Sequence, residues 1–301
     1  MNIVLCADES YARYGSVVMA SVIAHAINIE QIHFFMLTPG MSEETKNCLR
    51  ESVERSGAAL DVIDVDVAAL QGFKAGRFGI AALLRLLMHR YLPADCKRII
   101  YLDCDLLVRS DLSELWSMPL NGHTAAATIN LYSSSSRGAR KLPDDYFNSG
   151  VMLVDMTAWR EKCVGERALA YLEREGDNFQ YPDQDALNRV LEGDWCWLPA
   201  EWNFQPTAYA AVEKRYPHLF THMASLETAI RHPRIVHFIG SVKPWHAKCV
   251  HPFQEDFIAY SRHTAWPIDS KALASSLSWT ERIRMAFKQP KIRRRRRLTQ
   301  A

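Results

Sequence analysis

The chain contains 301 residues, of which 48% are hydrophobic, 10% are aromatic and 23% are charged. This composition excludes a largely disordered protein, and the length suits one or two globular domains. The formal net charge is +2, yet residues 279–301 hold nine Lys or Arg and one Glu, so the rest of the chain carries a charge of −6. The basic character therefore belongs to the tail and not to the body.

Short apolar runs and helical patterns alternate through the first hundred residues. Runs typical of strands occupy residues 3–7, 33–37 and 62–67. A first helical pattern covers residues 14–26. A second follows Ser42, which caps it, and ends at Gly57. A third is the apolar segment at 80–92, which carries Arg85. Because strands that alternate with helices are typical of parallel sheets, we expect an α/β fold.

The next strand-like run, residues 98–102, leads directly into Asp103-Cys104-Asp105. Alternate residues of an extended chain face the same way, so Asp103 and Asp105 are expected to converge on one point. Two carboxylates that lie close together repel each other unless a cation lies between them. Carboxylate ligands suit Mg²⁺ or Mn²⁺, which often share their ligands with a substrate phosphate. The alternative is a pair of solvated acids in a turn.

A second acid stands at a strand end, because Asp8 follows the first apolar run. In parallel α/β sheets, ligands bind beyond the carboxyl ends of the strands. Asp8 and Asp103 are therefore expected to face one crevice. This arrangement favours a metal and nucleotide site over the pair of solvated acids.

The second half of the chain continues with mixed elements. Asp111 and Glu114 have the spacing of a capping box that opens a short helix, and Asp183 is either a helix N-cap or a functional acid. Residues 133–138 form a polar loop. The remaining segments are expected to be strands at 124–130, 147–155 and 234–240, with a helix at 159–175.

Together these pieces resemble glycosyltransferase family 8, and within it the bacterial lipopolysaccharide and lipooligosaccharide galactosyl- or glucosyltransferases. The resemblance spans roughly residues 1–250. The matching pieces follow the order of the family and are Asp8, residues 101–105, residues 147–151, residues 183–185 and residues 237–246. The resemblance implies a GT-A fold, with a mostly parallel central sheet flanked by helices, and a UDP-sugar donor whose sugar is transferred with retention of anomeric configuration.

The same resemblance implies roles for individual residues. The matched metal ligands, usually for Mn²⁺, are Asp103, Asp105 and His237. The matched nucleotide and diphosphate residues are Cys6, Ala7, Asp8, Tyr11, Asp103, Cys104, Asp105, Gly240 and Lys243. The matched residues around the donor sugar are Arg85, Asn148, Asp183 and Gln184. The residue types suit these roles, because Tyr11 offers a ring that can stack on a base and Lys243 offers a positive charge to phosphate.

Retention requires either a covalent intermediate or attack from the face that the leaving group departs from. Because the amide of Gln184 is a poor nucleophile, we favour same-face attack, with Asp183 and Gln184 as positioning groups and Asp185 as a reserve candidate. Asn130, Ser10 and the loop at 72–79 depart from the family pattern. These departures leave the acceptor, and the choice between UDP-galactose and UDP-glucose, open.

The tail is expected to form an amphipathic helix that Pro290 ends, followed by five arginines at 293–297. Such a segment suits an anionic membrane surface. The alternatives are a solvated tail or non-specific nucleic-acid binding, and no specific nucleic acid is expected. We divide the chain into a GT-A domain at 1–265 and a membrane-associating tail at 266–301.

Seven scattered cysteines and the lack of a signal-peptide pattern favour a reducing compartment. The expected location is therefore cytoplasmic, on the inner face of the membrane. The expected function is metal-dependent retaining transfer of galactose or glucose from a UDP-sugar to a saccharide acceptor, either lipopolysaccharide core or another lipid-linked glycan. Two alternatives are a self-glucosylating enzyme that resembles glycogenin, and an adaptor with an inactive site.

Overall fold

The computed structural model describes residues 1–70, 72–73, 79–131, 145–176 and 179–299. The loop at 133–138 and most of 72–79 lie outside these residues. Within the described part, a mixed sheet of seven strands has the order β3-β2-β1-β4-β7-β6-β8, and four of its six strand pairs are parallel. The strands are β1 (Asn2–Cys6), β2 (His33–Thr38), β3 (Ala59–Asp64), β4 (Arg98–Leu102), β6 (Ala125–Ile129), β7 (Phe147–Asp155) and β8 (Trp195–Trp197). The expected α/β fold with a mostly parallel sheet is confirmed.

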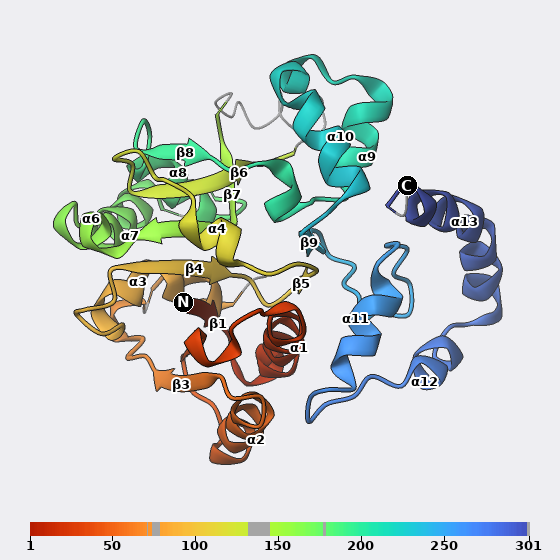
Figure 1. Ribbon diagram of the computed structural model, residues 1–301, viewed down its shortest axis with the longest axis horizontal. Helices are drawn as coiled ribbons and strands as arrows, with labels where there is room; N and C mark the ends of the chain where they lie inside the picture. Colours follow the sequence, from red (N-terminus) through yellow and green to blue (C-terminus); the bar gives the residue numbers. More distant parts are fainter. Residues whose placement is uncertain (71, 74–78, 132–144, 177–178, 300–301) are drawn as a thin grey trace.

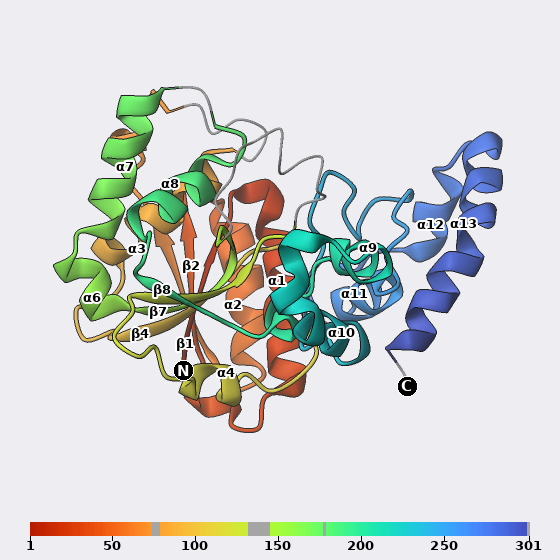
Figure 2. The same ribbon diagram turned by 90° about the horizontal axis from the view of Figure 1, so that it is seen from above.

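Helices cover both faces of this sheet (Figures 1 and 2). One face is covered by α1 (Glu9–His25), α2 (Glu43–Glu54) and α4 (Ser113–Ser117), and the other by α3 (Leu84–Tyr91), α6 (Met156–Glu161), α7 (Val164–Glu175) and α8 (Pro182–Val190). Successive strand residues point to opposite faces, so Val4 joins one core while Ile3 and Leu5 join the other. A strand buried on both faces reads as a continuous apolar run, which explains the pattern in the sequence.

A smaller sheet brings a distant part of the chain to the end of β4. It pairs β5 (Leu106–Val108) with β9 (Ile235–His237) in antiparallel fashion, and its register places Leu106 opposite His237. The third core packs around it, with α9 (Thr207–Lys214), α10 (Met223–Arg231) and α11 (Gln254–Ser261). The strand expected at 234–240 is therefore correct only as far as His237. The remaining described elements are η1 (Ile29–Gln31), η2 (Ala68–Leu70), η4 (Ile80–Leu83), η5 (Ala200–Asn203), η6 (Pro217–His222), α12 (Ser270–Ser275) and α13 (Trp279–Leu298).

Several boundaries in the first half of the chain differ from the expected ones. The helix expected to start at residue 14 starts at Glu9, because the Asp8 side chain accepts from the Tyr11 N–H at 2.9 Å and caps it. The expected cap at Ser42 is confirmed. The strand expected at 62–67 is β3, which ends at Asp64, and the helix expected at 80–92 begins as the 3₁₀ turn η4.

The single helix expected at 159–175 is wrong, because the chain forms α6 and α7 with Cys163 in the left-handed region between them (φ 49°). The break lets α7 pack closely on α3: a Cβ at Gly165 would lie 2.1 Å from the carbonyl oxygen of Leu86. The capping box expected at Asp111 and Glu114 is also wrong. Asp111 accepts from the Ser113 N–H at 2.7 Å, and Glu114 instead pairs with Arg234 at 2.6 Å.

The tail helix α13 does not end at Pro290, as expected, but continues to Leu298. Its last turns pack on the body of the protein, where Arg296 forms a two-pronged ion pair with Asp256 and Arg295 lies 4.3 Å over the Tyr209 ring. These contacts compensate for the backbone hydrogen bond that proline cannot make. Among the described residues, no helix combines the length and apolar character that crossing a membrane requires.

Candidate active site

A cleft of about 700 Å³ lies beyond the carboxyl ends of β1 and β4. The site residues named from the sequence line it, with the exceptions of Ala7 and the reserve candidate Asp185. Ala7 is fully buried, and its backbone N–H donates to the Leu37 carbonyl at 3.0 Å as part of the sheet. The cleft therefore gathers residues that are up to 240 positions apart, counted from Cys6 to His246.

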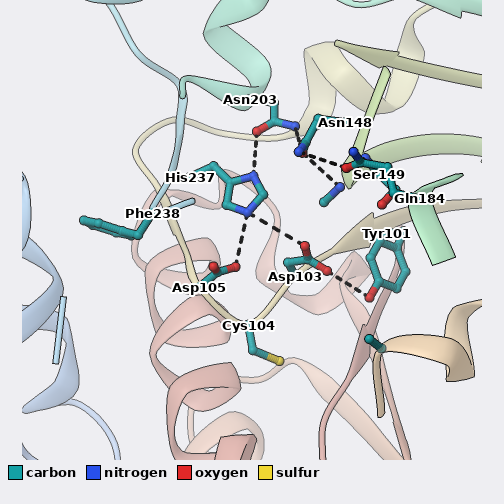
Figure 3. A network of polar contacts seen from close by, with 12 residues as sticks. Tyr101, Asp103, Cys104, Asp105, Asn148, Ser149, Gln184, Asn203, His237 and Phe238 are labelled. Carbon is teal, nitrogen blue, oxygen red and sulfur yellow. Dashed lines mark hydrogen bonds and ion pairs between the residues drawn. The ribbon is translucent and has the colours of Figure 1, made fainter. Parts of the chain in front are cut away.

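Asp103, Asp105 and His237 form a cluster whose candidate ligand atoms all lie within 4.8 Å of one another (Figure 3). His237 Nε2 lies 3.3 Å from Asp105 Oδ1 and 3.8 Å from Asp103 Oδ2. The two carboxylates follow β4, and the pairing of β5 with β9 brings in the imidazole. Two carboxylates and one imidazole that converge in this way fit a divalent cation such as Mn²⁺ or Mg²⁺.

The space for this cluster depends on a glycine in β7. A Cβ at Gly150 would lie 2.3 Å from Cε1 of His237 and 2.7 Å from Oδ2 of Asp103. Both distances are shorter than any normal contact, so a side chain here would displace two of the three candidate ligands. Because Gly150 has no side chain, β7 can pass directly behind the cluster.

We expect Gly150→Ala to weaken Mn²⁺ binding by at least about 10-fold, because the ligand atoms must move apart. Titration calorimetry with Mn²⁺ in the presence of UDP measures this change. The control is Gly193→Ala, which strains the backbone at a glycine of positive φ (75°) that does not line the cleft. Unchanged Mn²⁺ affinity in a folded Gly150→Ala protein would contradict the assignment of these ligands.

The charge on Asp105 is balanced by Lys243. The Lys243 ammonium donates to Oδ2 of Asp105 and, at 2.9 Å, to the carbonyl oxygen of Phe238. Burial by itself would raise the pKa of the Asp105 carboxyl, but Lys243 and His237 outweigh burial and hold that pKa well below its usual range. Asp105 is therefore a carboxylate at neutral pH, the form that a metal ion requires.

Arg85 joins the cluster to the opposite wall of the cleft. Its Nη2 lies 2.7 Å from Oδ1 of Asp103, its Nε lies 3.2 Å from Oδ2 of Asp183, and its Nη1 donates to the Ser149 carbonyl at 3.1 Å. Burial opposes the charge on Arg85, yet the two carboxylates raise its pKa above the usual value. The guanidinium also lies 4.5 Å over the Tyr101 ring. The charge on this apolar helix is therefore fully paired.

The interpretation of Asp183 as a helix N-cap is wrong. Helix α8 starts at Pro182 with Tyr181 in the cap position, and Asp183 lies inside the first turn. Its carboxylate pairs with Arg85 and accepts from the Ser149 hydroxyl at 3.3 Å. Burial raises the pKa of Asp183, and the neighbouring Arg85 opposes this rise. Asp183 is thus a buried acid directed to the cleft.

A chain of amide side chains forms the back of the cleft (Figure 3). Asn148 donates to Asn130 Oδ1 at 2.9 Å and to Gln184 Oε1 at 3.1 Å. Gln184 donates in turn to the Tyr146 hydroxyl at 3.1 Å, which donates to Asp185 at 2.5 Å. Asn148, Gln184 and Asn130 line the cleft, whereas the reserve candidate Asp185 lies behind it.

At the other end of the cleft, aromatic rings surround Tyr11. Tyr14 stacks on Trp245 with ring centroids 3.5 Å apart, and Tyr11 meets the ring of Trp245 edge-on at 5.8 Å. Tyr11 remains 39% exposed, so one face of its ring is available to a ligand. Gly240 adopts φ 94°, a backbone conformation that L side chains rarely adopt. These features suit a base at Tyr11 and a phosphate near Gly240.

The thiols of the two cysteines that line the cleft, Cys6 and Cys104, are buried. The Cys104 thiol donates to the Cys6 carbonyl at a distance of 3.3 Å. Burial raises the pKa of the Cys6 thiol to about 12. A thiol this far from ionisation is a weak nucleophile.

Three contributors were not found from the sequence. Ser149 holds both Arg85 and Asp183, Tyr146 holds Gln184, and Asn203 holds His237. Ser149 and Tyr146 lie within or beside the segment that carries the family resemblance, which was the available signal. Asn203 lies in a 3₁₀ turn outside any periodic pattern.

The mostly parallel sheet and the Asp103–Asp105 pair at the end of β4 define a glycosyltransferase with a GT-A fold. The chain belongs to glycosyl transferase family 8, which it matches over residues 2–249. Enzymes of this family generally use a divalent metal ion with a UDP-sugar. The family resemblance seen in the sequence is confirmed.

Several known proteins are similar to this chain. General stress protein A of Bacillus subtilis (strain 168) is 28% identical over 272 residues, covering 88% of this chain and 94% of that protein. Lipopolysaccharide 1,2-glucosyltransferase of Escherichia coli (strain K12) is 24% identical over 283 residues, covering 92% of this chain and 82% of that protein. The crystal structure of galactosyltransferase LgtC, in complex with donor and acceptor sugar analogs, superposes with a TM-score of 0.79 at 29% identity and covers 90% and 98% of the two chains.

Proposed function

We propose that the protein transfers galactose or glucose from a UDP-sugar to a saccharide acceptor, with retention of configuration and with Mn²⁺ or Mg²⁺ as its metal. The observation that carries this proposal is the convergence of Asp103, Asp105 and His237 in a cleft whose far wall is built around Arg85. Asp103 belongs to both the cluster and the far wall, since it faces His237 and pairs with Arg85. A metal-bound diphosphate and a sugar would thus lie side by side.

The residues at the metal end would act on the nucleotide. Asp103, Asp105 and His237 would hold the cation, which supplies stabilisation of negative charge on the departing diphosphate. Lys243 would add a second positive charge to that leaving group. Tyr11 would stack on uracil, and the carboxylate of Asp8 would accept from its ring N–H.

The residues at the end of the cleft that would hold the sugar are placed to orient the sugar and not to attack it. Both heteroatoms of Gln184 are engaged, since Oε1 accepts from Asn148 and the Ser149 N–H while Nε2 donates to Tyr146. Asp183 is held by Arg85. As the sugar carbon becomes oxocarbenium-like, the carboxylate of Asp183, which lines this wall, would stabilise the developing positive charge. This arrangement favours attack by the acceptor from the face that UDP leaves.

Release of UDP from a panel of UDP-sugars, measured with Mn²⁺ and with EDTA, tests the proposed function. Metal-dependent release from one sugar would support the proposal and identify the donor. Absence of UDP binding would overturn it. Glucose found on a tyrosine of the protein itself would favour a self-glucosylating enzyme instead.

The acceptor is proposed to be a lipid-linked glycan, such as lipopolysaccharide core. Support comes from similar proteins, which include a lipopolysaccharide glucosyltransferase and a galactosyltransferase. The second support is the tail. Trp279 and Phe287 are 75% and 82% exposed, and Arg293, Arg294 and Arg297 are also exposed. A helix that offers aromatic and basic side chains together suits an anionic membrane surface.

On this basis we propose that residues 1–265 form the catalytic domain and that residues 266–301 bind the cytoplasmic face of a membrane. Arg295 and Arg296 are excluded from lipid contact in this arrangement, because Arg295 contacts Tyr209 and Arg296 pairs with Asp256. The five arginines at 293–297 therefore divide into two that anchor the helix and three that face outward.

Replacing Arg293, Arg294 and Arg297 with glutamine is expected to weaken binding to anionic vesicles by at least about 10-fold, since each basic residue near such a surface contributes about 1 kcal/mol. Vesicle co-sedimentation measures the change. The control replaces three exposed basic residues outside residues 266–301, namely Lys97, Lys214 and Arg231. Equal binding by the α13 variant and the wild type would contradict the role of the tail. UDP release should be the same in all three proteins.

A further inference from the structure

Asn203 is a buried amide behind the wall of the cleft. It is the last residue of η5, it is 1% exposed, and it does not line the cleft itself. Its backbone position is fixed, because the next residue, Phe204, accepts from the His237 N–H at 2.9 Å and donates to the Ile235 carbonyl at 2.8 Å. The side chain of Asn203 is therefore held beside β9.

The two ends of this amide contact two different parts of the site (Figure 3). Oδ1 of Asn203 lies 2.9 Å from Nδ1 of His237, and Nδ2 donates to Oδ1 of Asn148 at 2.8 Å. Asn148 in turn donates to Gln184 at 3.1 Å. Asn203 is thus the link between the metal cluster and the amides of the sugar end.

The orientation of the linked amide side chains follows from one backbone group. The N–H of Gly150 can only donate, and it lies 3.1 Å from Oδ1 of Asn148. This oxygen is therefore an acceptor, so Asn203 must present its NH₂ group to it and its oxygen to His237. An amide oxygen can only accept, so Nδ1 of His237 carries the proton. The lone pair of Nε2 then faces Asp103 and Asp105, as metal binding requires.

We propose that Asn203 is a positioning residue that sets the His237 tautomer for metal binding and couples the metal cluster to Asn148 and Gln184. This inference rests on the proposed function, because it assumes that the cluster holds a divalent cation. Its two parts correspond to the two ends of the amide. The oxygen of Asn203 controls metal affinity, and the NH₂ group controls the placement of the amides around the sugar.

Two substitutions separate the parts. Asn203→Leu removes both contacts, and we expect Mn²⁺ affinity in the presence of UDP to fall by about 10- to 100-fold. Asn203→Asp keeps an oxygen for His237 but sets a second acceptor against Oδ1 of Asn148. We expect this variant to bind Mn²⁺ close to the wild-type affinity while its kcat for UDP release falls. Calorimetry gives the affinity, and steady-state kinetics give kcat.

Gln205→Leu is the matched control. Gln205 is also a 1% exposed amide with two hydrogen bonds, to the Leu131 N–H and the Ile129 carbonyl, but it does not contact the metal cluster. Its replacement is expected to lower stability in the same way and to leave Mn²⁺ affinity unchanged. A loss of Mn²⁺ affinity in this control equal to that in Asn203→Leu would overturn the inference. The loss would then follow from removing any buried amide and not from the contact with His237.

The tautomer is tested directly in the wild type. Nitrogen-15 NMR of the metal-free protein is expected to show the proton of neutral His237 on Nδ1, and a proton on Nε2 would overturn the inference even if no variant folds. Unchanged Mn²⁺ affinity in Asn203→Leu, with Mn²⁺ bound normally by the wild type, would overturn this inference alone. Failure of the wild type to bind Mn²⁺ with UDP would overturn the proposed function as well.

Discussion

Replacing Asp105 with alanine is expected to lower metal-dependent UDP release by at least about 100-fold, the loss seen when one charge-stabilising group is removed from an active site. Asp105 faces Nε2 of His237 at 3.3 Å and pairs with the ammonium of Lys243. Its removal leaves one carboxylate in the cluster and a partly buried Lys243 that has lost its ion-pair partner. Both changes disfavour a bound divalent cation.

The measurement is UDP release as a function of Mn²⁺ concentration. If Asp105 acts as a ligand, Asp105→Ala should need far more Mn²⁺ and should not reach the wild-type rate. Asp105→Asn is an informative second variant, because its amide still offers an oxygen but no charge. Its rate of UDP release is expected to lie between those of Asp105→Ala and the wild type. Asp61→Ala removes an exposed acid that pairs with His33 and should behave as wild type. An Asp105→Ala protein that keeps more than about a tenth of the activity would contradict the ligand role.

The convergence of Asp103 and Asp105 was predictable because its signal is local. Asp103 and Asp105 directly follow a strand, and the alternation of side chains along an extended chain brings them together. The same holds for Asp8, which follows the neighbouring strand β1. The place of His237 came from the family resemblance, and its contact with the acids depends on the pairing of β5 with β9, which joins segments about 130 residues apart. No pattern within either segment specifies that pairing.

Asp183 illustrates a limit of local reasoning. An acid in the first turn of a helix is stabilised by the helix dipole, whether or not it has a partner elsewhere. The sequence around residues 181–185 therefore fits a capping acid and a site acid equally well. Only the position of Arg85, about a hundred residues earlier, decides between them.

The wrong helix boundaries have the same origin. Periodicity continues through Cys163 and stops at Pro290, yet the chain breaks at the first and continues through the second. At Cys163 the cause is the close packing of Gly165 on α3, and at Pro290 it is the anchoring of Arg295 and Arg296 on the body. In both places tertiary contacts outweigh the local preference.

Replacing Arg85 with methionine is expected to lower the free energy of unfolding by about 3–5 kcal/mol, the cost of breaking a buried ion pair on one side. Methionine fills a similar volume on the apolar helix α3 but leaves Asp103 and Asp183 without their shared cation. The side chain of Asp183 is only 9% exposed, so water can replace the lost partner only in part. UDP release is expected to fall as well, because both carboxylates border the cleft.

Urea denaturation at neutral pH measures the loss, and a second substitution shows its cause. Adding Asp183→Asn to Arg85→Met removes one of the unpaired charges, so the double variant should be more stable than Arg85→Met alone. Arg85→Lys keeps the charge but not the fork that reaches Asp103, Asp183 and Ser149 together, so it should recover part of the stability and little of the activity.

Mn²⁺ provides a further check, because it supplies positive charge to Asp103 from the other side. If Asp103 is a metal ligand, Mn²⁺ with UDP should stabilise Arg85→Met more than it stabilises the wild type, since binding to the folded state adds to stability by mass action. Equal stabilisation of the two proteins would mean that the metal does not reach Asp103. Arg85 and the cation would then act at separate places, and the arrangement of metal and sugar side by side would be wrong.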